Sequence, residues 1–147
     1  MKQELVHDWM TSPVIRITPE TTLPEAHQLM SENNVRRLPV VDENDRLVGI
    51  VTRGDVRGAE PSQATSLSVW ELNYLLSNLY VDEIMTKSPV TIQEEATIGE
   101  AARLMLEYRI SGLPVVNRFG QLAGIITESD IFRMVVRHAW SEAEAVA

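Results

Sequence analysis

The sequence predicts an α/β (α+β) protein built from two copies of one β-α-β-β-α unit, and three observations carry this prediction. Sliding the sequence against itself by 75 positions aligns residues 6–56 with 81–131 and gives 20 identities, whereas about three are expected by chance. Each copy contains two nearly wholly apolar runs around a four-residue polar turn, which is the pattern of a buried hairpin. Each copy also has helical spacing behind an N-terminal capping signal. The chain is therefore an internal duplication.

Each copy opens with a short extended piece followed by a helix. The extended pieces are expected at Pro13–Ile17 and Pro89–Ile92. Thr22 with Glu25, and Thr97 with Glu100, have the spacing of a capping box, in which the Thr hydroxyl accepts from an amide and the Glu reaches back. Apolar residues at helical spacing then give each helix one buried face: Leu23, Ala26 and Met30, and Ile98, Ala101 and Met105. The helices are expected to end near Asn33–Asn34 and Tyr108–Arg109.

A hairpin and a second helix complete each copy. In the first copy the strands are Leu38–Val41 and Leu47–Val51 around the turn Asp42–Asp45, and the second copy repeats this pattern around Asn117–Gly120. Because these strands carry almost no polar residue, each sheet needs cover on a face that a lone unit cannot supply. The second helices are expected at residues 53–58 and 128–138.

The repeat divides the chain into residues 6–58, a linker with an inserted helix at 59–80, residues 81–138 and a tail at 139–147. Within the linker, Trp70, Tyr74, Leu75 and Leu79 recur at helical spacing, so a helix capped by Ser66 or Ser68 is expected. Two interpretations of its apolar face stay open. It supplies extra core, or it docks a partner or a second copy of the chain.

Composition and charge exclude several classes of protein. Hydrophobic residues make up 44% and charged residues 23% of the chain, as in folded globular domains, and no apolar run is long enough for a membrane span. The first residues lack the apolar stretch of a signal peptide and there is no cysteine, so a cytoplasmic location is expected. The net charge of −8 argues against nucleic acid or an anionic membrane as a partner.

Candidate binding residues lie where the last strand of each copy meets its second helix. Thr52 and Asp55 stand there in the first copy, and Thr127 and Asp130 in the second, with Ser129 as a further hydroxyl. Free amides at such a junction attract an anion, and an Asp carboxylate accepts two hydroxyls of a sugar. The same Thr-x-x-Asp spacing is also a capping box, which on its own accounts for both pairs. The two roles are compatible.

No catalytic constellation is recognisable. The sequence lacks a phosphate-binding loop, a dinucleotide glycine fingerprint, a metal-spaced cluster and a nucleophile elbow. Its three histidines are scattered and it has no cysteine, so nucleophilic catalysis lacks its parts. We expect a chain that is not an enzyme and that holds neither a metal nor a catalytic cofactor.

The paired motifs resemble a known family. Each copy has an initial Met-Thr, a central Leu-Pro-Val-Val and a closing Gly-Ile-Val/Ile-Thr-x-x-Asp, and together they resemble a tandem of cystathionine β-synthase (CBS) domains, a Bateman module, over about residues 6–138. The resemblance implies two β-α-β-β-α repeats packed sheet to sheet with pseudo-twofold symmetry. It also implies two clefts for adenosine ligands such as AMP, ADP, ATP or S-adenosylmethionine, and a homodimer of modules.

The resemblance also assigns the remaining site residues. Arg36 and Arg37 stand where relatives direct basic side chains toward phosphates, and a solvated arginine pair beside a strand is the alternative. The second copy has Ser111 and Gly112 there, so the two clefts are expected to differ. The base is expected against walls from the opposite repeat, namely Val90 and Ile110, Ser111, Gly112 and Leu113 for the Asp55 cleft, and Val14, Ile15, Val35, Arg36 and Arg37 for the Asp130 cleft.

The leading hypothesis is a regulatory module that binds an adenosine nucleotide and signals through a change of conformation or of contact with an unidentified protein. A structural module that dimerises or docks through Trp70 and Tyr74, with no nucleotide, is the alternative. Binding of nucleic acid is a remote third possibility. The leading hypothesis fails if Asp55 and Asp130 are both bonded to their own main chain and side chains fill both grooves.

Overall fold

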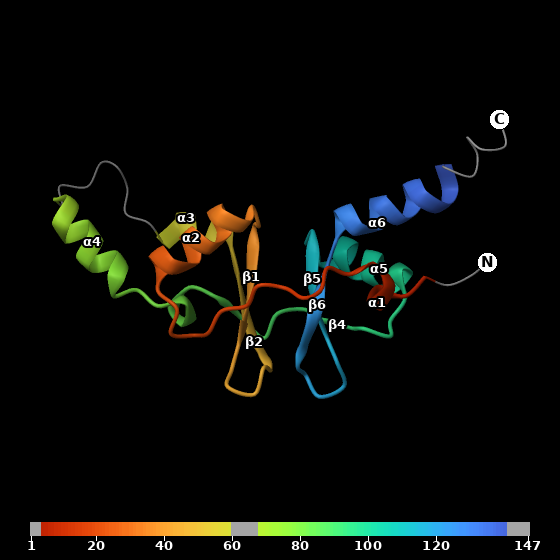
Figure 1. Cartoon of the computed structure of the whole chain (residues 1–147), viewed down its shortest axis with the longest axis horizontal. Helices are drawn as coiled ribbons and strands as arrows, with labels where there is room; N and C mark the ends of the chain where they lie inside the picture. Colours follow the sequence, from red (N-terminus) through yellow and green to blue (C-terminus); the bar gives the residue numbers. More distant parts are fainter. Residues whose placement is uncertain (1–3, 60–67, 141–147) are drawn as a thin grey trace. The chain divides into compact units, whose positions relative to one another are not determined.

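The computed structural model describes residues 4–59 and 68–140, and within it the chain forms two compact units. Unit 2 comprises Ile15–Pro89, and unit 1 combines the residues up to Val14 with those from Val90 onward. Figure 1 shows a small sheet with helices beside it in each unit. The N-terminal segment of the chain therefore folds with the second repeat. The linker residues 60–67 and the tail 141–147 lie outside the described residues.

Unit 2 contains a three-stranded antiparallel sheet in the order β1-β2-β3. The strands are β1 (Arg37–Val41), β2 (Leu47–Thr52) and β3 (Thr86–Lys87). The helices are α2 (Leu23–Asn33), α3 (Arg53–Ala59) and α4 (Val69–Ser77), followed by the short η1 (Val81–Glu83). Its core gathers one face of α2 with the inward side chains of the hairpin, including Leu23, Met30, Leu38 and Val51.

Unit 1 contains a three-stranded sheet in the order β4-β5-β6, in which β4 runs parallel to β5. The strands are β4 (Ile92–Gln93), β5 (Gly112–Val116) and β6 (Leu122–Thr127). The helices are α1 (Val6–Trp9), α5 (Ile98–Tyr108) and α6 (Glu128–Val135), which continues as a π-helix, η2 (Val136–Trp140). Its core repeats that of unit 2, with Ile98, Met105, Leu113 and Ile126 buried.

The predicted mixed α/β class, hairpins and helices are confirmed. Both first helices bury the predicted face and end at a left-handed residue, Asn34 after α2 and Arg109 after α5, which releases the chain from the helix. The capping box is complete at Thr22 and Glu25. At Thr97 only the bond that its hydroxyl accepts from the Glu100 amide, 3.1 Å, is present. That helix begins beside the N-terminal segment, where the Ile98 amide donates to the Glu4 carbonyl at 2.9 Å.

The predicted opening strands are shorter than expected. Ile17 forms a single parallel bridge to Val40, held by the Ile17 amide on the Pro39 carbonyl at 3.0 Å and the Val41 amide on the Ile17 carbonyl at 2.8 Å. Extending this parallel ladder toward Ile15 would require Pro39 to donate an amide hydrogen to the Ile15 carbonyl, and proline has no amide hydrogen. Pro114 holds the same position in β5, where β4 has only two residues. The Leu-Pro-Val-Val motif thus limits the opening strand.

The Met-Thr motif of each repeat packs on the other repeat's hairpin. Thr86 pairs with Ile50 of β2, and Thr11 pairs with Ile125 of β6. This approach requires the glycine of the closing motif. A Cβ on Gly124 would lie 2.7 Å from both the Thr11 carbonyl oxygen and the Met10 Sδ. The two motifs that recur in the sequence are therefore structural partners across the repeats.

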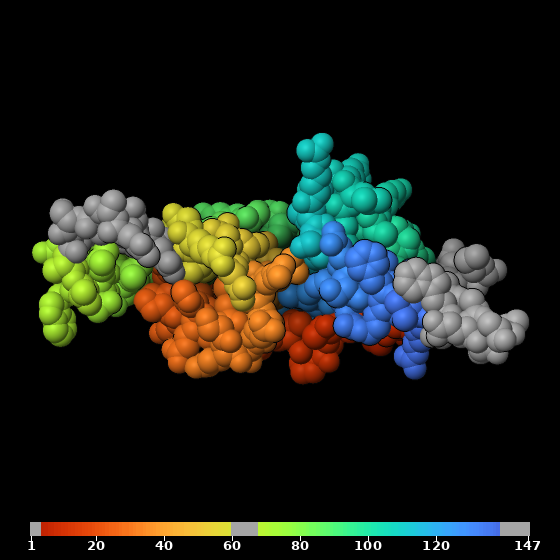
Figure 2. Space-filling model, turned by 90° about the horizontal axis from the view of Figure 1, so that it is seen from above, coloured from red at the N-terminus to blue at the C-terminus, as the bar shows by residue number. Residues whose placement is uncertain are grey.

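The predicted inserted helix is present as α4, with a capping box between Ser68 and Glu71. Leu76 and Leu79 pack against the core of unit 2. Trp70 is 84% and Tyr74 72% exposed, so the interpretation of these aromatic residues as extra core is wrong. In the space-filling view α4 forms part of the molecular surface (Figure 2).

Candidate functional site

In unit 2, Thr52 ends β2 and Asp55 lies in the first turn of α3. The Thr52 amide donates to Asp55 Oδ2 at 2.8 Å, and the Asp55 amide donates to Thr52 Oγ1 at 3.2 Å. The capping role that the sequence left open is therefore present. Asp55 is only partly buried, and within residues 4–59 and 68–140 no hydrogen bond reaches its Oδ1. One carboxylate oxygen of this cap is available to another donor.

The segment before β1 lies against the same junction. The Arg53 amide donates to the Arg36 carbonyl at 2.8 Å, and Arg53 Nη2 donates to the Val35 carbonyl at 3.4 Å. The Arg36 side chain is exposed, and Arg37 is the first residue of β1. The structure thus brings Val35 and Arg36 to the helix that carries Asp55, within one unit.

In unit 1, Thr127 and Asp130 form the matching junction between β6 and α6. The Thr127 amide donates to Asp130 Oδ2 at 2.9 Å, and Thr127 Oγ1 lies 3.1 Å from the same oxygen. The Ser111 carbonyl accepts from the Glu128 amide at 3.0 Å, as the Arg36 carbonyl does in unit 2. Ser129 is exposed in the first turn of α6. Asp130, however, is only 3% exposed.

Sequence reasoning missed the partner of Asp130. Arg133, one turn along α6, places Nη1 2.7 Å from Asp130 Oδ1, and its side chain is 64% exposed while that of Asp130 is 4% exposed. The signal was present in the sequence, since oppositely charged residues three apart on a helix are neighbours. Asp55 and Asp130 therefore both cap their helices through Oδ2. They differ in Oδ1, which accepts from Arg133 in Asp130 and from no described residue in Asp55.

The other predicted residues lie in or beside the cores of their own units. Ile15 and Val35 pack against the core of unit 2, and Val90 and Ile110 against that of unit 1. The rest lie beside them, with Val14 partly buried and both Gly112 and Leu113 buried in β5. The walls expected from the opposite repeat stay a prediction.

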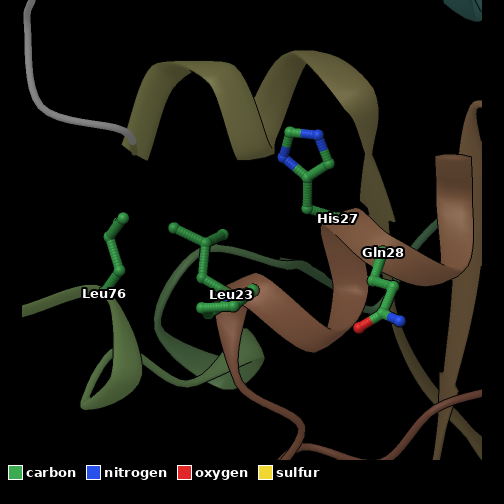
Figure 3. Close-up of a pocket in the computed structure, with 5 residues that line it drawn as sticks. Leu23, His27, Gln28 and Leu76 are labelled. Carbon is green, nitrogen blue, oxygen red and sulfur yellow. The ribbon is translucent and has the colours of Figure 1, made fainter. Parts of the chain in front are cut away.

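A separate hollow of about 250 Å³ lies between α2 and α4. Figure 3 shows Leu23, His27 and Gln28 on α2, with Leu76 of α4 across from them. Ligand pockets for drug-sized molecules measure about 300–1,000 Å³, and none of the predicted binding residues lines this one. It is not the nucleotide site that the sequence predicts.

Two further observations concern the part of the chain that the structure describes. No three His, Asp or Glu side chains come together there in a way that could hold a metal ion. No helix there combines the length and the apolar character that crossing a membrane requires.

The chain belongs to the CBS domain family, whose model matches residues 6–62 and again residues 81–137. It is 35% identical over 133 residues to a CBS domain-containing protein of Dictyostelium discoideum, covering 90% of this chain and 92% of that protein. It is also 40% identical over 119 residues to the inosine-5'-monophosphate dehydrogenase of Korarchaeum cryptofilum. That match covers 81% of this chain but only 22% of the enzyme, and it falls on the enzyme's CBS part.

Solved CBS pairs have the same fold. CBSX2, a protein of Arabidopsis thaliana solved in complex with AMP, has a TM-score of 0.79 and 31% identity, covering 92% of this chain and 99% of that one. The CBS domain pair of protein MJ0100, solved with 5'-methylthioadenosine and S-adenosyl-L-methionine, has a TM-score of 0.74 and 32% identity, covering 90% and 96%. The solved relatives thus include pairs that bind adenosine ligands.

Proposed function

We propose that this chain is a regulatory module that binds an adenosine-containing nucleotide, AMP, ADP, ATP or S-adenosylmethionine, and signals through its conformation or its contact with a partner protein. A homodimer and a cytoplasmic location belong to the proposal. The observation that carries it is the Thr-x-x-Asp junction, present in both repeats of a chain whose solved relatives hold AMP and S-adenosylmethionine.

The chemistry of the Asp55 junction suits a ribose. A carboxylate offers about four lone-pair sites, and the Thr52 amide occupies one of them. The two ribose hydroxyls can therefore both donate to Asp55. Thr52 Oγ1 accepts from the Asp55 amide, so its own hydrogen is available to a phosphate. Arg36 has an exposed side chain, and its carbonyl accepts from the Arg53 amide of the same helix, so its guanidinium can supply the full positive charge that a phosphate needs.

A thermal-shift panel tests this proposal. The ligands are AMP, ADP, ATP, NADH, S-adenosylmethionine and a cyclic dinucleotide, and 2',3'-dideoxyadenosine 5'-monophosphate serves as the control without a diol. A ligand at about 100 times its Kd stabilises the folded state by about 2.7 kcal/mol, which raises the melting temperature by about 5–10 °C at this chain length. The dideoxy control is expected to give no shift. Silence of every ribose-containing ligand at millimolar concentration would contradict the proposal.

A second candidate function has its own observation. Trp70 and Tyr74 stand exposed one turn apart on α4, and with Glu71 and Leu75 they line a mostly apolar hollow of about 370 Å³. A helix that is apolar on both faces is normally covered. This favours a structural module in which α4 pairs with α4 of a second copy, each indole entering the other's hollow.

Sedimentation of the whole chain distinguishes this alternative. Trp70→Ala is expected to shift a dimer to monomers if α4 forms the contact, while Phe119→Ala, which truncates a loop aromatic that is 59% exposed, leaves the dimer intact. A Trp70→Ala chain that remains dimeric would rule out α4 as the contact.

A further inference from the structure

The two repeats differ at the position one turn after each aspartate. Arg133 follows Asp130 by three residues, and the matching residue after Asp55 is Gly58. Arg133 Nη1 lies 2.7 Å from Asp130 Oδ1. At Gly58 even an added Cβ would meet nothing within 4 Å among the described residues. The same helical position thus carries a cation in unit 1, whereas in unit 2 it has no side chain and the space around it is open.

The hydrogen bonds of Asp130 leave it little capacity for a ligand. Of the four lone-pair sites of a carboxylate, two on Oδ2 face the Thr127 amide and hydroxyl, and one on Oδ1 faces Arg133. A ribose diol has two donors, so it would have to displace one of these groups. Asp55 accepts only the bond from the Thr52 amide among the described residues.

We infer that Arg133 competes with the ribose for the Asp130 carboxylate. The chain therefore binds a single adenosine nucleotide, at Asp55. The inference rests on the proposed function and names which of its two sites is open. The Arg133 side chain is 64% exposed, and its guanidinium bonds to Asp130 Oδ1. Shortening or neutralising this side chain is therefore expected to release the carboxylate. Its effect is a penalty on ligand affinity of roughly ten- to a hundredfold, the scale of one hydrogen bond to a charged group.

Isothermal titration of the full chain tests the inference, with AMP, ATP and S-adenosylmethionine each used as a probe. Wild type is expected to bind one molecule per chain. Asp55→Asn is expected to weaken binding at least tenfold, whereas Asp130→Asn leaves it unchanged. Asparagine keeps a side-chain oxygen that accepts the Thr amide, so both variants are expected to fold, as far-ultraviolet circular dichroism checks.

Substitution of Arg133 and of Gly58, the residues that differ between the two repeats, tests the inference more specifically. Arg133→Met keeps the apolar stem without the charge and is expected to raise the stoichiometry from one to two. Gly58→Arg is expected to weaken the Asp55 site at least tenfold, and Gly58→Ala, which adds no charge, serves as its matched control. Neither substitution alters an aspartate, so a loss of the cap cannot explain their effects.

The outcomes separate the inference from the proposed function. Two equal sites in wild type, or binding that survives Asp55→Asn and is lost in Asp130→Asn, would overturn the inference while leaving nucleotide binding intact. Unchanged stoichiometry in Arg133→Met would overturn the role of Arg133. Absence of binding by wild type and by every variant, with all three probes, would contradict the proposed function and the inference together.

Discussion

The segment Met10–Thr11 approaches Gly124 closely, and this contact allows a quantitative prediction. In Gly124→Ala the new Cβ would lie 2.7 Å from the Thr11 carbonyl oxygen and 2.7 Å from the Met10 Sδ. The sulfur can rotate away. The carbonyl cannot, because Thr11 and Ile125 exchange two backbone hydrogen bonds, of 2.8 and 3.1 Å. The added methyl therefore has to separate the bridge or bend β6.

The expected loss follows from two opposing effects. Overpacking by one methyl against a fixed backbone costs about 1–3 kcal/mol, and Gly→Ala recovers about 0.4–1 kcal/mol by restricting the unfolded chain. The difference between these two effects is centred between 1 and 2 kcal/mol, so we expect Gly124→Ala to lower the free energy of unfolding by about 1–2 kcal/mol. Urea denaturation followed by circular dichroism measures this directly.

The repeat supplies an internal comparison. At Gly49 the nearest backbone atom to an added Cβ is the Thr86 oxygen at 3.0 Å, and the closest atom, at 2.5 Å, is the flexible Met85 Sδ. Gly49→Ala is therefore expected to lose about 1 kcal/mol or less. Gly99→Ala is the control, since its nearest neighbour is Thr97 Oγ1 at 3.7 Å, and it is expected to be neutral or slightly stabilising. A Gly124→Ala chain as stable as wild type, or less affected than Gly49→Ala, would refute the reasoning.

Three further predictions concern stability and are checked by the same denaturation curves. Glu25→Ala is expected to lower the free energy of unfolding by about 0.5–1 kcal/mol because the Glu25 carboxylate caps α2. Glu100→Ala is expected to lower it by less, because at Glu100 the bond to Thr97 comes from the backbone amide, which alanine keeps. Equal losses for the two variants would contradict this prediction. Leu76→Ala is expected to lower the free energy of unfolding by about 1–2 kcal/mol, because Leu76 packs on the core of unit 2. Tyr74→Ala is expected to lower it by less than about 0.5 kcal/mol, because Tyr74 is exposed. A larger loss for Tyr74→Ala than for Leu76→Ala would contradict this assignment. Asp45→Asn, which weakens the partly exposed ion pair with Arg16, should lose at most about 1 kcal/mol, and the loss should shrink in high salt.

Local patterns were enough to predict most of the fold. The hairpins and the first helices depend on apolar periodicity and on caps such as Thr22 and Ser68, whose effects act within a few residues. The short opening strands were not predicted, although Pro39 stands in the sequence, because the limit it sets depends on which neighbour β1 pairs with. The packing of Met10 and Met85 on the other repeat is likewise a long-range property that no local pattern contains.

The candidate site likewise has local features, which the sequence predicts, and features that depend on long-range packing, which it does not. The Thr-x-x-Asp spacing predicted both the junction and its capping alternative, and the hydrogen bonds at Asp55 and Asp130 are those of caps. The degree of burial was not predictable, since Asp130 is closed off only when α6 has packed. The exposure of Trp70 was left open by the sequence for a related reason: helical spacing shows that a face is apolar and leaves open what covers it.

The two repeats carry matched motifs, yet their charges point to unequal sites. Arg36 and Arg37 stand in the first repeat where the second has Ser111 and Gly112, so the first repeat has more positive charge for a phosphate. In the second repeat, the arginine nearest the carboxylate, Arg133, is bonded to Asp130 itself. A cation that neutralises the carboxylate is directed away from a phosphate and also removes an acceptor for the ribose. Both differences therefore act in the same direction, and under the proposed function they make Asp55 the residue at which a nucleotide binds.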